Sequence, residues 1–223
     1  MSASSHDRRP SAAATDPPSP LSPDTAAAVA AVYDLYDPPL WLVTAAEGPE
    51  PGSRRGGCIA TFVARASIIR DMPRMVAGIA RQHHTWRMIE ASGRFCVHLL
   101  PEDRLDLVRR FALSSGKQHD KYADLPDGPE QRTPEGSPFI AGTLSWLDCR
   151  VETRMSTGDR SVYIAAVTGG GVLDADAGPP LTAARLMALM PEPERAELDR
   201  LYARDGGIDA EAIRTWRATR PAR

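Results

Sequence analysis

Residues 81–85, Arg-Gln-His-His-Thr, form a polar sequence between an apolar run and a segment with helical spacing. The first turn of a helix leaves its N–H groups unpaired, and the helix dipole adds partial positive charge at the same end. Such a helix start binds anions. For the same residues, a polar loop with a threonine N-cap is the alternative interpretation. The side chains of this candidate anion site are Arg81, Gln82, His83, His84 and Thr85.

Two further segments carry charged side chains. After a predicted helix, Lys117 and Lys121 lie four residues apart, and two lysines can neutralise a phosphate as point charges. A solvated turn is the alternative there. Residues 156–163 contain a Gly-Asp hairpin turn with Arg160 beside it, which by itself indicates a turn and no ligand.

The Gly56–Gly57 pair marks a third candidate region, at the start of a predicted strand. Glycine lets another group approach the backbone closely. A planar heteroaromatic ligand could therefore lie along residues 58–61, with its edge bonded to main-chain N–H and C=O groups. A hairpin glycine pair explains the same two residues equally well.

Metal chemistry and nucleophilic catalysis are not indicated. His83, His84, His119 and Asp120 could meet in space, but adjacent histidines usually point in different directions, and no HxH, HxxxH or CxxC spacing occurs. The sequence also lacks G-x-S-x-G, a P-loop, HExxH, and G-x-G-x-x-G after a strand. We therefore predict no metal site.

Composition excludes several classes of protein. The chain has 223 residues, of which 42% are hydrophobic and 25% charged, as in an ordinary globular protein. With a net charge of −2 and scattered arginine pairs, nucleic acid and anionic membranes are not expected as partners. No apolar run is long enough to cross a membrane, and the start lacks the apolar core of a secretory signal. Cys58, Cys96 and Cys149 lie far apart, which indicates buried thiols in a reducing cytoplasm.

The elements that must position these residues are mostly strands. At least five are predicted, joined mainly by short loops, which favours an antiparallel barrel over a doubly wound sheet. One of them, 94–100, alternates so that Cys96 and His98 oppose its apolar residues, which predicts a half-buried strand. Helical spacing precedes this strand at 85–93, where Gly93 ends the helix, and follows it at 102–113. The other predicted strands are 40–45, 57–69, 144–154 and 161–172.

The two ends of the chain differ from this middle part. Residues 1–24 are Ser-, Ala- and Pro-rich with few large apolar groups, so we predict a disordered tail. Residues 181–223 are predicted to form two or three short helices, punctuated by Pro191, Pro193 and the Gly206–Gly207 pair.

Six segments taken in order resemble one known family. They are GCIATFVARAS, MPRMVAGIARQHHTW, IEASGRFCVHLL, FALSSGKQHDKYADL, GTLSWLDCRVE and TGDRSVYIAAV. Each motif is weak alone, but together, over about residues 40–180, they resemble the flavin reductase-like FMN-binding family. That resemblance implies a mainly β fold: an antiparallel, Greek-key-type split barrel with peripheral helices. The barrel would span 25–180, and 181–223 would be a helical C-terminal extension that packs on it or covers the flavin.

The resemblance also implies a homodimer that holds FMN, with FAD as the alternative, near the subunit interface. Lys121 would reach the flavin tail, and Ser67 would lie near the ribityl chain or the ring. The phosphate would be held by the residues already identified as an anion site, Arg81, Gln82, His83, His84 and Thr85. The residues lining the isoalloxazine ring, largely through backbone, would be Cys58, Ile59, Ala60 and Thr61.

The implied activity is reduction of FMN by hydride transfer from NADH or NADPH, with a flavin-dependent monooxygenase as a candidate partner. The flavin carries the chemistry, so no catalytic residue of the protein is required. The sequence departs from the family pattern at Ile59, Tyr122 and Arg160, and in the turn 82–85, which reads Q-H-H-T where the family has S-R-T-H. Arg160 replaces a histidine that in some relatives lies near the nicotinamide. It remains our candidate for a residue that contacts the nicotinamide donor. This departure supports the alternative, an FMN-holding electron-transfer or sensor protein that does not use nicotinamide.

Overall fold

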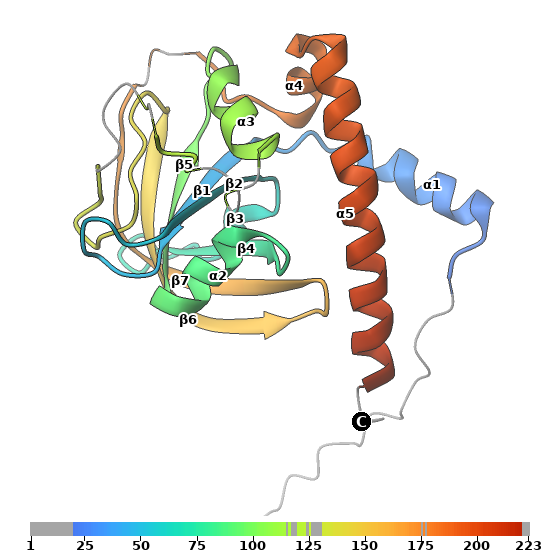
Figure 1. The fold of residues 1–223 in the computed structure, drawn as a ribbon, viewed down its shortest axis with the longest axis horizontal. Helices are drawn as coiled ribbons and strands as arrows, with labels where there is room; N and C mark the ends of the chain where they lie inside the picture. Colours follow the sequence, from blue (N-terminus) through green and yellow to red (C-terminus); the bar gives the residue numbers. More distant parts are fainter. Residues whose placement is uncertain are drawn as a thin grey trace, which may run out of the picture.

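The computed structural model describes residues 20–114, 116, 120–123, 125, 131–174, 176 and 178–219. Seven strands form one sheet in the order β2-β1-β5-β6-β7-β4-β3, and every neighbouring pair is antiparallel (Figure 1). The strands are β1 (Trp41–Ala46), β2 (Arg55–Ala60), β3 (Val63–Arg65), β4 (Arg74–Ala80), β5 (Arg94–Leu99), β6 (Ser145–Ser156) and β7 (Arg160–Val172). The helices are α1 (Pro23–Tyr33), α2 (His84–Ser92), α3 (Leu105–Ala112), α4 (Ala183–Leu189) and α5 (Glu192–Thr219).

The sheet curls into a half-barrel because its two edge strands are consecutive in the sequence. Only Thr61 and Phe62 separate the end of β2 from the start of β3. The single strand predicted at 57–69 is therefore wrong, since the chain changes edges at these two residues. Gly78 on β4 allows the change: its N–H donates to Phe62 O at 2.8 Å, and a Cβ at Gly78 would lie 2.2 Å from the Phe62 ring.

Two hydrophobic cores hold the half-barrel together. The first packs α2 against the sheet through Met88 and Ile89 together with strand residues such as Phe95. The second contains Phe111 of α3 and Leu186 of α4. Burial of each such side chain contributes about 1.5–3 kcal/mol. As predicted, α2 ends at Gly93, which adopts a left-handed conformation with φ 67°.

Strand β5 is buried on both faces, which the alternation pattern did not predict. Cys96 and His98 are fully buried because the loop 131–144 covers their side of the strand. The His98 ring lies between two main-chain groups: Nδ1 donates to Leu42 O at 3.3 Å, and Nε2 accepts from the Ile140 N–H at 3.1 Å. Burial lowers the pKa of His98 to about 4, so the ring is neutral near pH 7.

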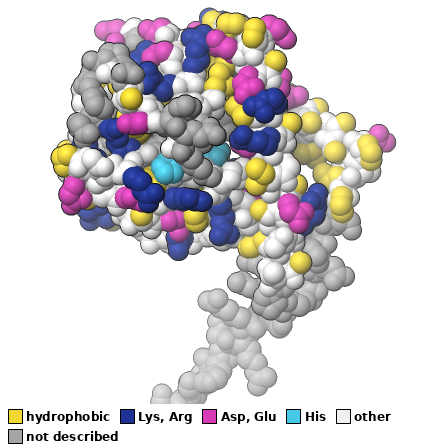
Figure 2. All heavy atoms as spheres, in the orientation of Figure 1, with side chains coloured by type: hydrophobic (Ala, Val, Ile, Leu, Met, Phe, Trp, Pro, Cys, Tyr) yellow, Lys and Arg dark blue, Asp and Glu magenta, His cyan; other side chains and the backbone are white. Residues whose placement is uncertain are grey.

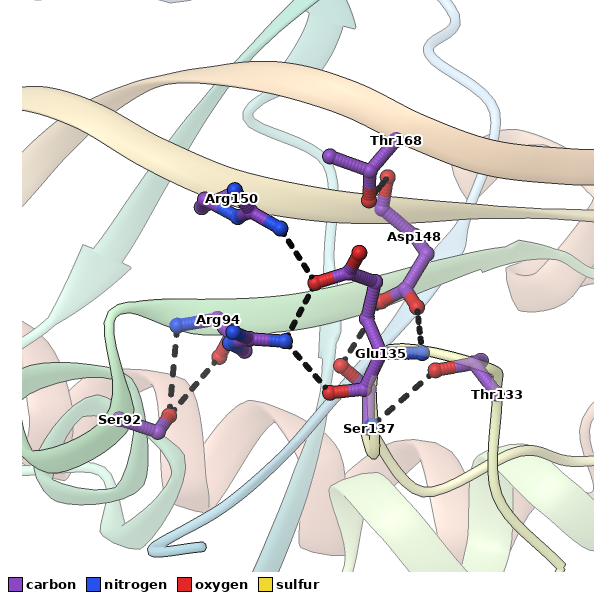
Figure 3. Close-up of polar contacts among 8 residues, drawn as sticks. All are labelled: Ser92, Arg94, Thr133, Glu135, Ser137, Asp148, Arg150 and Thr168. Carbon is purple, nitrogen blue, oxygen red and sulfur yellow. Dashed lines mark hydrogen bonds and ion pairs between the residues drawn. The ribbon is translucent and has the colours of Figure 1, made fainter. Parts of the chain in front are cut away.

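A polar network fixes the same covering loop to the sheet (Figure 3). Buried Asp148 accepts from Ser137 Oγ at 2.8 Å and from the Glu135 N–H at 3.3 Å. The Glu135 carboxylate pairs with Arg150 at 2.7 Å and with Arg94. Arg94 also donates to Glu135 O at 2.8 Å. Both carboxylates of this network therefore have donors, which indicates a structural role.

The C-terminal helix α5 is one continuous helix, so the predicted break at Gly206–Gly207 is wrong. The break predicted at Pro191 is confirmed, because Met190 before it is extended with ψ 137°, whereas Pro193 lies inside α5 and the break predicted there is wrong. Helix α5 runs along one side of the half-barrel, near the free end of the β6–β7 hairpin (Figure 1). Gly158 in that hairpin makes the contact close, because a Cβ there would lie 2.7 Å from Trp216 Cβ.

Helix α1 has Ser22 as its N-cap, whose hydroxyl accepts from the Thr25 N–H at 3.2 Å. None of its residues is buried. Within the described residues, no helix is both long and apolar enough to span a membrane.

Candidate functional site

The turn 81–85 connects β4 to α2 and is held by backbone bonds. Arg81 N–H donates to Asp159 O at 2.9 Å, and His83 N–H donates to Ala80 O at 3.1 Å. His83 is the N-cap of α2 and makes no side-chain hydrogen bond to the first helical turn. Thr85 is not the cap; it is the second residue of the helix and is buried. The start of α2 therefore keeps N–H groups that no side chain caps.

Gly56 and Gly57 bring two helices onto strand β2. A Cβ at Gly56 would lie 2.9 Å from Thr85 Cα, and one at Gly57 would lie 2.5 Å from the Phe111 ring. The close approach predicted at these glycines is therefore real, but the chain's own α2 and α3 make it. The turn 81–85 therefore lies directly beside β2, next to these two glycines.

The donors of the turn differ in burial. Arg81 is exposed, and its guanidinium lies 5.4 Å from the centre of the Trp86 ring. Gln82 is half-buried, and its side-chain nitrogen faces the carboxylate of Asp209 without reaching hydrogen-bond geometry. On the face shown in Figure 2, histidine side chains lie beside Lys and Arg side chains near the centre of the molecule. This region can therefore bind an anion.

Cys58, His83, Thr85 and Lys121 meet behind the turn. Burial would raise the pKa of the Cys58 thiol, but hydrogen bonds to His83 and Thr85 and the charge of Lys121 bring that pKa below its usual value. The Cys58 hydrogen bond in turn raises the pKa of His83, against the effect of burial. The pair therefore favours a thiolate beside an imidazolium more than isolated side chains would.

Lys121 is buried, and two of its three ammonium donors are used within the chain. Nζ donates to Phe111 O at 2.7 Å and to Gly57 O at 3.1 Å. Burial lowers the pKa of Lys121 to about 8, while the nearby Cys58 acts in the opposite direction. Lys121 thus adds positive charge to the middle of β2, beside Gly57 and Cys58.

The remaining predicted ring-side residues are more exposed. Ile59 and Ala60 are half-buried at the end of β2, and Thr61 is exposed at the strand change. Ser67 lies in the loop after β3, where its hydroxyl accepts from the Ile69 N–H at 3.1 Å and its carbonyl accepts from Arg65 Nε at 2.6 Å. Among the described residues, no hydrogen bond connects Ser67 to the turn 81–85.

Arg160 lies next to the turn because it pairs with Ala80 in the β4–β7 ladder. Its guanidinium pairs with Asp159 at 2.5 Å and with Asp209 at 3.2 Å. The hairpin turn therefore brings a cation to the edge of the anion site, where two carboxylates hold it.

Two acidic residues of α5 belong to this region and were missed from the sequence. Asp205 Oδ2 lies 3.8 Å from His83 Nε2, and Asp209 pairs with Arg160. They are four residues apart, so they project from the same face of the helix. Burial raises the pKa of Asp209. The signal available in the sequence was two acidic residues four positions apart, with two glycines between them. Only the fold shows which basic side chains these two carboxylates contact.

Lys117 and His119, which were considered for phosphate or metal binding, lie outside the described residues. Asp120 bonds Arg55 at 2.8 Å and accepts from the Tyr122 N–H at 3.0 Å. Across the described ranges, no group of three or more His, Cys, Asp or Glu side chains is arranged to hold a metal ion.

Comparison with known proteins adds independent information. Residues 34–187 match the family model described as flavin reductase like domain. The chain is 35% identical over 102 residues to HsaB, the reductase subunit of a flavin-dependent monooxygenase from Mycobacterium tuberculosis, covering 46% of this chain and 51% of HsaB. It is 30% identical over 137 residues to a flavin reductase from Pseudomonas putida, covering 61% of this chain and 74% of that protein. The chain thus spans about half the length of HsaB.

A solved structure supports the same relationship. Component B of nitrilotriacetate monooxygenase from Mycobacterium thermoresistibile superposes with a TM-score of 0.58 at 26% identity, covering 71% of this chain and 82% of that one. The family match contains all seven strands and ends before α5 begins. The strand order, the turn before α2 and the sequence match all agree. The chain therefore belongs to the flavin reductase-like domain family of FMN-binding split barrels.

Proposed function

We propose that this chain is a flavin-binding oxidoreductase that reduces FMN by hydride transfer from NADH or NADPH. The observation that carries the proposal is the uncapped start of α2, with its exposed arginine and buried amide, beside strand β2. That arrangement suits a ligand with a charged phosphate at one end and a flat ring at the other. It also lies inside the part of the chain that matches the family.

The donors in the turn fit a phosphate group. Gln82 Nε2 is buried without a hydrogen-bond partner, and no carboxylate of the described residues pairs with Arg81. An incoming phosphate would satisfy both, since buried donors without partners are costly. In this proposal residues 81–85 bind the phosphate, and backbone groups of residues 58–61 orient the ring.

Bound FMN would supply the hydride and electron chemistry. The chain's own contribution is electrostatic. Lys121, whose pKa of about 8 keeps it charged near pH 7, places positive charge beside Cys58, and positive charge there favours the form of the ligand that has taken up electrons. No side chain is required to donate or accept a proton.

Arg160 decides between the two candidate activities. In the reductase, it would contact the nicotinamide donor. In an FMN-holding carrier or sensor, Arg160 would instead stay with Asp159 and Asp209, the contacts it makes here. We favour the reductase because one relative described above is named a flavin reductase and another the reductase subunit of a flavin-dependent monooxygenase.

We further propose a cytoplasmic homodimer that supplies reduced flavin to a monooxygenase. The three cysteines are free and buried, which suits a reducing compartment. Exposed Val32, Tyr33, Leu35 and Tyr36 form an apolar stretch in and after α1, and exposed apolar surface of this kind marks contact sites. The monooxygenase partner follows from the name of the HsaB relative.

The test uses the full chain purified with FMN. We expect a yellow protein that oxidises NADH or NADPH only when FMN is present, followed by the absorbance of the reduced nicotinamide. Bound flavin that is reduced by dithionite but by neither nicotinamide would select the carrier or sensor. A protein that takes up no FMN would overturn the proposal altogether.

A further inference from the structure

A cavity of about 730 Å³ lies between the C-terminal half of α5 and two turns of the half-barrel. Its size falls in the range of small-molecule sites. Arg81 and Gly158 form the barrel side. The α5 side includes Arg204, Gly207, Glu211 and Trp216. Arg81 also belongs to the turn 81–85, so the cavity and the predicted phosphate site share this residue.

The side chains of this cavity suit a nucleotide. Arg81 offers a cation that no described carboxylate neutralises, whereas Arg204 is paired with Asp205 at 2.8 Å. Half-buried Trp216 offers an aromatic surface on which a base can stack. Glu211 is exposed along the same helix, where it pairs with Arg214 at 2.9 Å, and carboxylates accept hydrogen bonds from ribose hydroxyls in dinucleotide sites.

Gly207 leaves space open on the α5 side of the cavity. Glycine inside a helix is unfavourable, and packing does not require one at this position, because an added Cβ would meet no atom within 4 Å. The open space beside Gly207 belongs to the cavity. Gly206 is equally free of contacts but does not line the cavity.

We infer that this cavity binds the adenosine 5′-phosphate half of a dinucleotide whose other half occupies the flavin or nicotinamide position. The inference rests on the proposed function. Two dinucleotides carry this group, FAD and NADH. Helix α5 lies outside the residues that match the family model.

The first experiment compares the dissociation constants of FAD and FMN by quenching of flavin fluorescence. If FAD is the ligand, wild type binds it about tenfold more tightly than FMN, as expected for one stacked base. Gly207→Leu fills the cavity and removes that preference while leaving FMN binding unchanged. Gly206→Leu is the matched control, because both changes raise helix propensity and only one reaches the cavity.

A second pair of variants tests the aromatic surface. Trp216→Ala should abolish the preference, and Trp216→Phe should keep most of it. Tyr202→Ala is the control, because Tyr202 is an exposed aromatic residue of the same helix that does not line the cavity. Circular dichroism on each variant shows whether α5 remains helical.

If NADH is the ligand, wild type binds FAD and FMN alike, but Gly207→Leu raises the KM for NADH about tenfold and Gly206→Leu leaves it unchanged. Either pattern supports the inference. The inference is overturned if Gly207→Leu and Gly206→Leu have the same dissociation constant for FAD and the same KM for NADH while both still bind FMN. Failure of wild type to bind FMN or FAD would instead overturn the proposed function, and this inference with it.

Discussion

Two polar regions of the molecule are built on opposite principles. In the network around Asp148, the buried carboxylate accepts from Ser137 and Glu135, and the ion pairs of Arg94 and Arg150 converge on the Glu135 side chain (Figure 3). In the turn 81–85, a buried amide nitrogen lacks a partner, the helix start lacks a side-chain cap, and the pKa values of Cys58 and His83 are displaced.

The difference shows which region the fold uses for stability and which it leaves available for a ligand. Matched donors and acceptors inside a protein fix its structure. Partnerless donors and perturbed pKa values cluster where a ligand completes the site. The comparison predicts that damage to the Asp148 network lowers stability without changing ligand affinity, and that damage to the turn has the converse effect.

The largest effect is expected from Asp148→Ala. The substitution leaves the Ser137 hydroxyl and the Glu135 N–H without their buried acceptor, so the free energy of unfolding should fall by about 2–5 kcal/mol. Urea denaturation measures it. Glu152→Ala is the control, because its ion pair with Arg74 at 2.7 Å is solvent-exposed and contributes at most about 1 kcal/mol. A loss of FMN affinity in folded Asp148→Ala protein would contradict the division between the two regions.

His98 gives the stable region a signature in its pH dependence. Unfolded His98 takes up a proton near pH 6.5, whereas the buried ring does so only near pH 4. Between these values the unfolded state binds more protons, so the free energy of unfolding falls as the pH drops from 6.5 to 4. The contribution is about 3 kcal/mol at its limit.

Denaturation of wild type and His98→Gln at pH 7 and pH 4.5 isolates this contribution. The variant is less stable at pH 7 because it loses the two main-chain contacts of the ring. Its stability should depend less on pH over the same window, since contributions from the other histidines cancel in the difference. Parallel pH dependence of the two proteins would show that His98 is not buried in neutral form.

The sequence indicated much of this architecture because local patterns determined it. Alternation located β5, and Gly93 marked the end of α2, since both depend on residues close together in the chain. The strand change at Thr61–Phe62 was not predictable, because residues 57–69 are uniformly suited to a strand and the break depends on β2 pairing with β1 while β3 pairs with β4. Burial of His98 depends in the same way on the distant loop that donates the Ile140 N–H.

The candidate site was predicted in part for the same reason. Residues 81–85 lie together in the chain, and helix physics alone indicated an anion site there. Thr85 was misassigned as a cap because the alternative interpretation took it as the helix start, while contact with Gly56 buries it in the first turn. Asp205 and Asp209 reach the site from a helix over a hundred residues away, and no local pattern specifies that contact.

The smallest expected effect bears most directly on the ligand region. Arg81→Ala should weaken FMN binding about ten- to hundredfold and riboflavin binding far less, because only FMN carries a phosphate and a charge-assisted contact contributes about 1.5–3 kcal/mol. Arg87→Ala is the matched control, an exposed arginine later in α2. Flavin fluorescence titrations give the four dissociation constants, and urea denaturation should show nearly unchanged stability, since Arg81 is exposed. Equal losses for FMN and riboflavin would mean that Arg81 acts on the ring or on the fold, and the partnerless donors of the turn would then need another anion.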